Sequence, residues 1–382
     1  MNFYKYFNSQ KKQMIDFLKY ITCLESPSSD KNSVDKCSAY VLKELKRIGL
    51  NVTSFPQKKI GDIYVAEFPS SGQETEKDFV LILSHIDTVW PVGKIKTMPF
   101  RISGDKIYGP GVLDMKAGIL MAVFVFKAFK ELKIFPRKKI VFFINSAEEI
   151  GSEEAYIIIR NLAKKSSYVL CLEPSLPGGA LKIQRKGRIV IQLTAHGKAA
   201  HAGTPEKGIN AIEELCCQLQ KLRKIRTNGI TANIGQIQGG EKANIVAEKA
   251  SAILDIRFWK NSDKEKVMEF FKQLKPVIPM AKIDFKVESF TPPMEKTKAS
   301  MQLFEKIRKI GQSLNQDLTS GKTGGGSDAS IAANMGIPTL DGLGADGEGI
   351  HAENEHLLIS SLIPRTTLLA EILTTIGDSP HS

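Results

Sequence analysis

Apolar positions follow two different spacings along the chain, and each spacing predicts a different kind of element. Short runs rich in β-branched and large apolar residues predict four strands, at 79–83, 140–144, 168–172 and 337–340. Apolar residues at helical spacing predict helices at 11–22, 35–49, 116–133 and 153–164. Because strands alternate with helices, we expect an α/β domain whose central sheet is mostly parallel and flanked by helices.

The segment 187–292 has a different order of elements. Its pattern predicts strands at 188–195, 231–237, 249–258 and 283–287, and helices at 209–225 and 263–274. The resulting βαββαβ order is that of a ferredoxin-like unit, and Pro292 and Pro293 close it. We therefore expect a small domain at 187–292, inserted into a larger domain formed by 1–186 and 293–382.

Length and composition agree with two globular domains. The 382 residues exceed what one hydrophobic core usually serves, and the shares of hydrophobic (42%) and charged (25%) residues are ordinary. No apolar run reaches the length of a membrane span, and the polar, aromatic start lacks a signal-peptide pattern. Five cysteines, an odd number, indicate no disulfide framework. We expect a cytoplasmic protein without a membrane partner.

The chain is basic, with a formal net charge of +12. Nucleic-acid binding is one interpretation of such an excess. The lysines, however, are spread along helical stretches such as 127–139 and 260–275 and form no dense block. We therefore interpret the charge as a solvated surface and expect no nucleic-acid partner, although the charge could help to attract an anionic substrate.

Side chains suited to catalysis follow each predicted strand of the larger domain. His85 follows the first strand, and Glu148 and Glu149 follow the second. Glu173 follows the third, and a glycine-rich loop leads from the fourth to His351. Ligands of parallel α/β sheets bind beyond the carboxyl ends of the strands, so we expect these side chains to converge at one edge of the sheet.

These residue types suit a pair of metal ions. Asp114, in a turn ahead of a predicted helix, can reach the same edge, which makes two histidines and three carboxylates available as ligands. This set suits zinc, cobalt or manganese. Five ligands are too many for one open catalytic site, but they serve two ions about 3.5–4 Å apart if one carboxylate bridges them. Asp87, two residues after His85, can accept the second imidazole N–H.

Each of these residues also has a plainer interpretation. A single His or Glu after a strand is usually a cap or a solvated residue, and adjacent glutamates such as Glu148 and Glu149 are usually surface charge. Their joint occurrence after four strands favours a metal centre. One of the two glutamates can then bind an ion while the other accepts a proton from water.

At these residues the sequence resembles the co-catalytic zinc exopeptidases, the family of glutamate carboxypeptidase, aminoacylase and succinyl-diaminopimelate desuccinylase, and the glutamate carboxypeptidase branch is the most similar. The matching motifs occur in order along nearly the whole chain. They are Ser-His-Ile-Asp-Thr (84–88), Gly-Pro-Gly-Val-Leu-Asp-Met-Lys-Ala-Gly (109–118), Glu148-Glu149, Glu173-Pro174, Gly-Lys-Ala-Ala-His-Ala-Gly (197–203), Gly-Gly-Gly-Ser-Asp-Ala (324–329) and His351. Each motif alone is a weak signal, whereas seven in order are specific.

The resemblance implies a role for each residue of the site. His85 and Glu173 would hold one ion, and Glu149 and His351 the other. Asp114 would bridge the two ions, most simply two zinc ions per chain. Glu148 would be the general base for the attacking water and would later protonate the leaving amine, with Asp87 as a further catalytic residue beside His85. The ions would polarise the scissile carbonyl.

The resemblance also implies residues outside the metal centre. His201 of the small domain would reach the reaction centre of a neighbouring chain, which makes the small domain a lid and dimerisation module. Asn244 and Arg257 would contact the C-terminal carboxylate of the substrate, and Gly325 would shape the pocket floor. Arg257 could instead pair with a local acid. The stretch 289–292 lacks the basic residue of glutamate-specific relatives, which puts strict glutamate specificity in doubt.

The predicted function is therefore hydrolysis of an amide bond. We expect a carboxypeptidase-type enzyme, acting as a homodimer, that releases a C-terminal and possibly acidic amino acid from a short peptide or an N-acyl amino acid. An N-acyl-amino-acid deacylase or dipeptidase would share every metal ligand and differ only in its pocket. A catalytically silent binding protein on the same scaffold is the alternative from another class.

Overall fold

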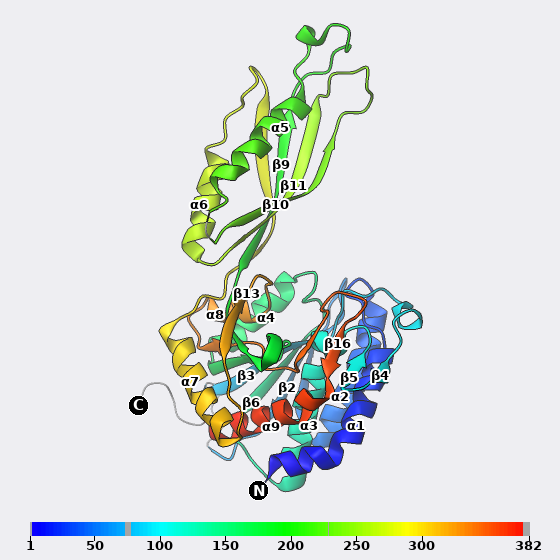
Figure 1. Cartoon of the computed structure of the whole chain (residues 1–382), viewed down its shortest axis with the longest axis vertical. Coiled ribbons are helices and arrows are strands. Elements are labelled where there is room, and N and C mark those ends of the chain that lie inside the picture. The colour runs from blue at the N-terminus through cyan, green and yellow to red at the C-terminus, as the bar shows by residue number, and fades with distance from the viewer. Residues whose placement is uncertain (1, 73–77, 228, 377–382) are drawn as a thin grey trace. The chain divides into compact units, whose positions relative to one another are not determined.

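The chain divides into two units, each with its own hydrophobic core (Figure 1). The computed structural model describes residues 2–72, 78–227 and 229–376. The first unit comprises 1–183, 296–322 and 327–382, and the second comprises 184–295 and 323–326. The second unit thus includes the segment 187–292 expected as an insertion, and it also includes the glycine-rich segment 323–326, which we had placed in the larger domain.

A six-stranded sheet forms the centre of the first unit. In spatial order its strands are β1 (Asn51–Phe55), β2 (Ile63–Phe68), β6 (Ile140–Asn145), β3 (Phe79–His85), β7 (Ser166–Cys171) and β14 (Thr339–Leu340). The pairs β6–β3, β3–β7 and β7–β14 are parallel, which confirms the predicted sheet. The antiparallel strands β1 and β2 were not predicted. β1 is mostly exposed and β2 mostly buried, so neither shows a regular alternation.

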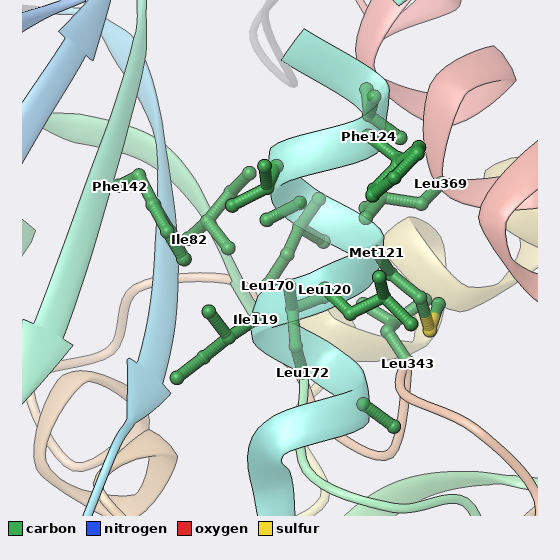
Figure 2. Close-up of a cluster of buried hydrophobic side chains, with 14 of the residues drawn as sticks. Ile82, Ile119, Leu120, Met121, Phe124, Phe142, Leu170, Leu172, Leu343 and Leu369 are labelled. Carbon is green, nitrogen blue, oxygen red and sulfur yellow. The ribbon is translucent and has the colours of Figure 1, made fainter. Parts of the chain in front are cut away.

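Helices supply the rest of this core. They are α1 (Phe3–Cys23), α2 (Lys31–Ile48), α3 (Ala117–Leu132), α4 (Glu153–Ala163), α7 (Lys298–Ser313), α8 (Ala329–Ala333) and α9 (Ile359–Thr375). The first ten residues of α3 are all buried, because the helix is apolar on every side. Figure 2 shows α3 between the strands that carry Ile82 and Phe142 and the helix that carries Leu369. Among the described residues, no helix is both long and apolar enough to cross a membrane.

Short strands hold together the loops that surround the site. They form a small antiparallel sheet in the order β15 (Gly347–Glu348), β16 (His356–Leu358), β5 (Lys106–Tyr108) and β4 (Arg101–Ser103). β8 (Leu181–Arg185) and β13 (Ser320–Thr323) form a two-stranded sheet. In the small sheet, His356 pairs with Tyr108, so the loop that precedes β16 and the turn that follows β5 leave the sheet side by side. The sequence did not predict these strands, because runs of two to five residues are too short to show a clear period.

The second unit has the predicted βαββαβ order. Its elements are β9 (Gly187–His196), α5 (Ala211–Lys221), β10 (Thr231–Gly239), β11 (Lys249–Phe258), α6 (Asn261–Lys272) and β12 (Lys282–Thr291). The sheet order is β10–β11–β9–β12, with every pair antiparallel. Alternate residues of β9 and β11 are buried in the second core with residues of α5 and α6. The ferredoxin-like arrangement expected for this segment is therefore present.

Candidate metal centre

The carboxyl ends of three parallel strands bring the predicted ligands together. His85 is the last residue of β3, and the turn that carries Glu148 and Glu149 begins directly after β6. Glu173 follows β7 by two residues. β6 and β7 are the two neighbours of β3, so these side chains leave the sheet at the same edge. Asp114 arrives from the turn before α3, where the peptide bond to Met115 is cis.

Asp114 lies at the centre of the cluster, with its two oxygens facing different partners. Oδ1 lies 3.3 Å from Nε2 of His85, which is also 3.3 Å from Oε1 of Glu173. Oδ2 lies 3.4 Å from Nε2 of His351, which is also 3.2 Å from Oε2 of Glu149. Five residues from distant parts of the chain therefore form two groups that share one carboxylate.

The spacing of these atoms fits metal coordination. Two ligand atoms that are each about 2.1 Å from the same tetrahedral ion lie about 3.4 Å apart. Single donor atoms from His85, Asp114 and Glu149 lie within 4.8 Å of one another, as do those of His85, Glu148 and Glu173. The imidazole and carboxylate donors also match the preferences of zinc, cobalt and manganese. The arrangement fits the binding of divalent cations.

The pKa values of the clustered groups also favour the binding of cations. Burial raises the pKa of Glu148 well above its usual value, and burial likewise raises the pKa of Glu149. Hydrogen bonds that the His351 ring donates to Asp114 and Glu149 raise the pKa of His351 to about 10. Burial alone would lower the pKa of His85, but hydrogen bonds to Asp114 and other carboxylates raise it well above its usual value. Burial and the neighbouring carboxylates thus make negative charge unfavourable in this cluster, and divalent cations can offset that cost.

Asp87 organises the loop of the two glutamates more than it orients the imidazole. Its Oδ1 and Oδ2 accept hydrogen bonds from the backbone N–H groups of Glu148 (3.1 Å) and Glu149 (3.2 Å). Its backbone oxygen lies 3.0 Å from Nδ1 of His85, whereas Oδ1 is 3.5 Å away. The second imidazole nitrogen therefore faces Asp87, as the sequence predicts, and lies nearer to its main-chain oxygen than to its carboxylate.

The turn after β6 sends the two glutamates in different directions. Glu149 reaches His351, whereas Glu148 lies beside His85 and Glu173. The two residues lie in a turn beyond the end of β6, and the geometry of that turn separates their side chains. Asn145 shapes the turn, since its Oδ1 accepts from the next two backbone N–H groups at 2.8 and 3.1 Å.

The remaining predicted site residues belong to the second unit. His201 is exposed in the loop after β9, and Asn244 is exposed in the loop between β10 and β11. Arg257, on β11, donates from Nε to Asp255 at 3.0 Å and from Nη1 to the backbone oxygen of Gly324 at 2.9 Å. The oxygen of Gly325 accepts from an arginine of β8 at 3.2 Å. Arg257 thus has the local acidic partner that the sequence left as an alternative.

Several residues of the site were not singled out from the sequence. Ser28, in the loop between α1 and α2, donates to Asp87, and Glu355 accepts hydrogen bonds from the turn that carries Asp114. Asp328 accepts from Asn145 at 2.7 Å, and burial raises its pKa to about 7. Asp328 lies within a motif that we noted for its glycines, and Glu355 follows His351 by four residues. Both residues therefore lie in or near the sequence motifs, but a single acidic residue in a loop does not by itself indicate a site.

Comparison with known proteins places the chain in a family. The model of peptidase family M20/M25/M40 matches residues 81–375. Carboxypeptidase G2 of Pseudomonas sp. (strain RS-16) is 28% identical over 373 residues, which cover 94% of this chain and 88% of that protein. Succinyl-diaminopimelate desuccinylase of Nautilia profundicola is 25% identical over 360 residues, 90% of this chain and 93% of that protein. Among solved structures, aminopeptidase PepT of Bacillus cereus has a TM-score of 0.76 at 21% identity, covering 96% of this chain and 99% of that one.

Fold and site together define a metallohydrolase of the peptidase type. The family match spans most of the chain, and the chain belongs to peptidase family M20/M25/M40. The resemblance seen in the sequence motifs is thereby confirmed, and so is the expectation of an enzyme that hydrolyses peptide-type bonds. The likeness to PepT shows the shared fold.

Proposed function

We propose that this chain is a two-metal hydrolase that releases the C-terminal amino acid from a short peptide or an N-acyl amino acid. The observation that carries the proposal is the division of the Asp114 carboxylate, whose two oxygens lie 3.3 Å from His85 and 3.4 Å from His351. A carboxylate whose oxygens face two separate sets of ligands suits a bridge between two cations.

In this proposal each ligand has a defined place. His85 and Glu173 hold one ion, Glu149 and His351 hold the other, and Asp114 holds both. Zinc is the ion that we propose, and cobalt or manganese would suit the same donors. When bound, the ions would polarise the scissile carbonyl and lower the pKa of the attacking water.

Glu148 is the general base of the proposal. Its carboxylate lies near His85 and Glu173 but is not the glutamate that pairs with His351, so it remains free to act on water. It would accept the proton of the attacking water and deliver it to the leaving amine. Asp87 supports this role, because its carboxylate accepts a hydrogen bond from the backbone N–H of Glu148 and so positions that residue.

Metal analysis and one substitution test the proposal together. Dialysed chain should contain close to two divalent ions, and Glu148→Gln should retain them while kcat falls by ~10²–10⁴-fold. Glu265→Gln, the same change on an exposed residue of α6, is the matched control and should behave like the parent. A metal-free parent chain would overturn the proposal, and full turnover by Glu148→Gln would reassign the base. Two bound ions without turnover of any amide substrate would favour the binding-protein alternative.

The choice between carboxypeptidase, deacylase and dipeptidase depends on the substrate pocket. The relatives named above include both a carboxypeptidase and a desuccinylase, which supports both kinds of substrate. Turnover of acyl-glutamate, acyl-lysine and unmodified dipeptides should be compared side by side. We expect the acyl amino acids to be preferred, and a higher kcat/KM for unmodified dipeptides would favour the dipeptidase alternative.

Arg257, Asn244 and Gly325 remain our candidates for contact with the substrate. Arg257 holds Asp255 through Nε and Nη2, and its third contact is to the oxygen of Gly324. Binding a substrate carboxylate would therefore require the arginine to exchange a neutral partner for a charged one, which is a favourable exchange. We expect Arg257→Ala to raise KM for substrates with a free C-terminal carboxylate and to leave KM unchanged for the corresponding amides.

We also propose that the chain works as a homodimer in the cytoplasm. The second unit has open edge strands, β10 and β12, which suit pairing between chains. Nδ1 of His201 accepts from the backbone N–H of Gly203 at 3.0 Å, which leaves Nε2 as the donor for a partner chain's substrate. Mixing His201→Ala with Glu148→Gln should restore activity that neither variant has alone, and a mixture without activity would exclude catalysis in trans. None of the five cysteines, all of which lie among the described residues, forms a disulfide, which supports a reducing compartment.

A further inference from the structure

Glu355 is a buried carboxylate next to the candidate metal centre, and it is not one of the proposed metal ligands. Only 1% of the residue is exposed. Its Oε1 accepts hydrogen bonds from the backbone N–H groups of Leu113 (2.9 Å) and Asp114 (3.1 Å). Its Oε2 accepts from the backbone N–H of Gly111 (3.0 Å) and from the indole Nε1 of Trp90 (2.9 Å). Each oxygen therefore accepts two hydrogen bonds.

The four partners of this carboxylate are all donors. Three of them are N–H groups of one short turn, 111–114, and this turn ends with Asp114. A carboxylate offers about four acceptor positions, so the geometry uses the whole hydrogen-bonding capacity of Glu355. Backbone N–H groups that converge in this way form a concave site for an anion. In this protein the anion is part of the chain, and it holds the conformation of the turn that presents Asp114.

The same residue holds the loop that carries His351. Glu355 follows His351 by four residues and directly precedes β16, which is paired with β5. Within the loop, the N–H of Glu355 donates to the oxygen of Ala352 at 2.9 Å, and the N–H of Ala352 donates to the oxygen of Gly349 at 2.8 Å. His351 lies in the turn between Gly349 and Ala352 with a positive φ of 60°, which is uncommon for a residue other than glycine.

We propose that Glu355 is a positioning residue that fixes Asp114 and His351 relative to each other and so sets the affinity for the ion that these two residues share. Its backbone is part of the His351 loop, and its carboxylate accepts hydrogen bonds from the turn that presents Asp114. The side chain of His351 is half-exposed, so its position depends on the loop that carries it, and Glu355 ties that loop to the Asp114 turn. This inference rests on the two-metal function proposed above.

Glu355→Gln is the direct test, and Glu353→Gln is its matched control. The amide keeps the shape of Glu355 but turns an NH2 group towards donors, so two of the four hydrogen bonds fail. Glu353 lies in the same loop, but its side chain is 81% exposed and forms an ion pair with Lys94. The affinity of each chain for Zn²⁺ and Co²⁺ should be measured by competition with a chelator, together with kcat, KM and the melting temperature of the metal-free chain.

We expect Glu355→Gln to bind one ion as the parent does and the second ~10–100-fold more weakly, the range seen when partners of metal ligands are removed. Its kcat should fall by a similar factor at limiting metal, recover partly with excess metal, and leave KM nearly unchanged. Glu353→Gln should match the parent. Parent-like affinity for both ions in Glu355→Gln would overturn the proposal, as would a loss of affinity that Glu353→Gln shares.

A second variant decides the question if Glu355→Gln does not fold. Trp90→Phe removes one of the four donors and keeps the carboxylate, so we expect it to fold and to bind the second ion a few-fold more weakly than the parent. Unchanged affinity in that variant would overturn the role of this hydrogen-bond cluster. The parent chain separates this result from the function itself, because a parent that binds only one ion or none overturns the two-metal function and this inference with it.

Discussion

The hydroxyl of Ser28 donates a hydrogen bond of 2.6 Å to Oδ2 of Asp87. Both residues are buried, and 59 positions of sequence separate them. The same carboxylate accepts the backbone N–H groups of Glu148 and Glu149, so the first loop of the chain supports the residue that shapes the catalytic turn. Ser28 is itself held beside β3, because its N–H donates to the oxygen of Thr88.

Replacing Ser28 tests whether this contact matters. Ser28→Ala leaves one buried carboxylate acceptor without a donor, and we expect a loss of about 1–3 kcal/mol in the free energy of unfolding. Because Asp87 keeps its two backbone donors, kcat should fall by only ~2–10-fold. Urea denaturation and steady-state kinetics measure the two effects. Ser9→Ala, on the exposed side of α1, should change neither, and a parent-like Ser28→Ala would show that the hydroxyl is dispensable.

Removal of metal should affect both activity and stability. The cluster holds several carboxyl groups at short distances, so in the metal-free chain no divalent cation offsets the repulsion among them. We expect a chelator to abolish turnover and to lower the melting temperature. Zinc, cobalt or manganese should restore both. A free ion concentration of 100 times Kd stabilises the folded chain by about 2.7 kcal/mol. A chelator-treated chain with unchanged turnover and melting temperature would contradict a metal centre of any kind.

Gly118 lies where α3 passes the end of β7. A methyl group on this residue would collide with the backbone oxygen of Leu172, the residue that precedes Glu173. We expect Gly118→Ala to destabilise the chain by about 1–3 kcal/mol, because backbone cannot yield as a side chain can. Activity should fall as well, since the displaced segment carries a ligand. Gly235→Ala, where the nearest atom would lie at an ordinary 3.6 Å, is the control for the change of residue type.

Asp255 should make the second unit sensitive to acid. Burial would raise the pKa of its carboxyl group, but hydrogen bonds from Arg257 and Arg188 outweigh burial and hold the pKa below its usual value. A carboxylate whose pKa is lower in the folded chain stabilises the fold above the unfolded pKa of about 3.9, and this stabilisation is lost as the pH falls through the folded pKa.

The expected result is a pH-dependent effect of Asp255→Asn. The variant should melt below the parent at neutral pH, and the two melting temperatures should converge as the pH falls below the unfolded pKa of about 3.9 and through the lower folded pKa. Asp317→Asn, an exposed aspartate of the first unit, should show little difference at either pH. A constant gap between Asp255→Asn and the parent across this pH range would show that the ion pairs with the two arginines do not cause the difference.

Much of the fold and the place of the site could be predicted from local patterns. The helix at 116–133 was visible as an apolar run, and it is observed as α3. The strand ends near His85 and Glu173 could be predicted because a polar residue follows a run of apolar residues at each place. By contrast, β1 and the strands of the small sheet are short or exposed, and no period marks them.

The sequence by itself determined which residue types follow the strands, and with them the class of chemistry, because a strand end is a local pattern of apolar and polar residues. Only the tertiary structure decided which partners those residues meet. The carboxylate of Glu355 reaches backbone N–H groups more than 240 positions away, and Ser28 reaches Asp87 across α2 and three strands. Such contacts depend on how whole elements pack against each other, and no spacing within a single segment of chain encodes them.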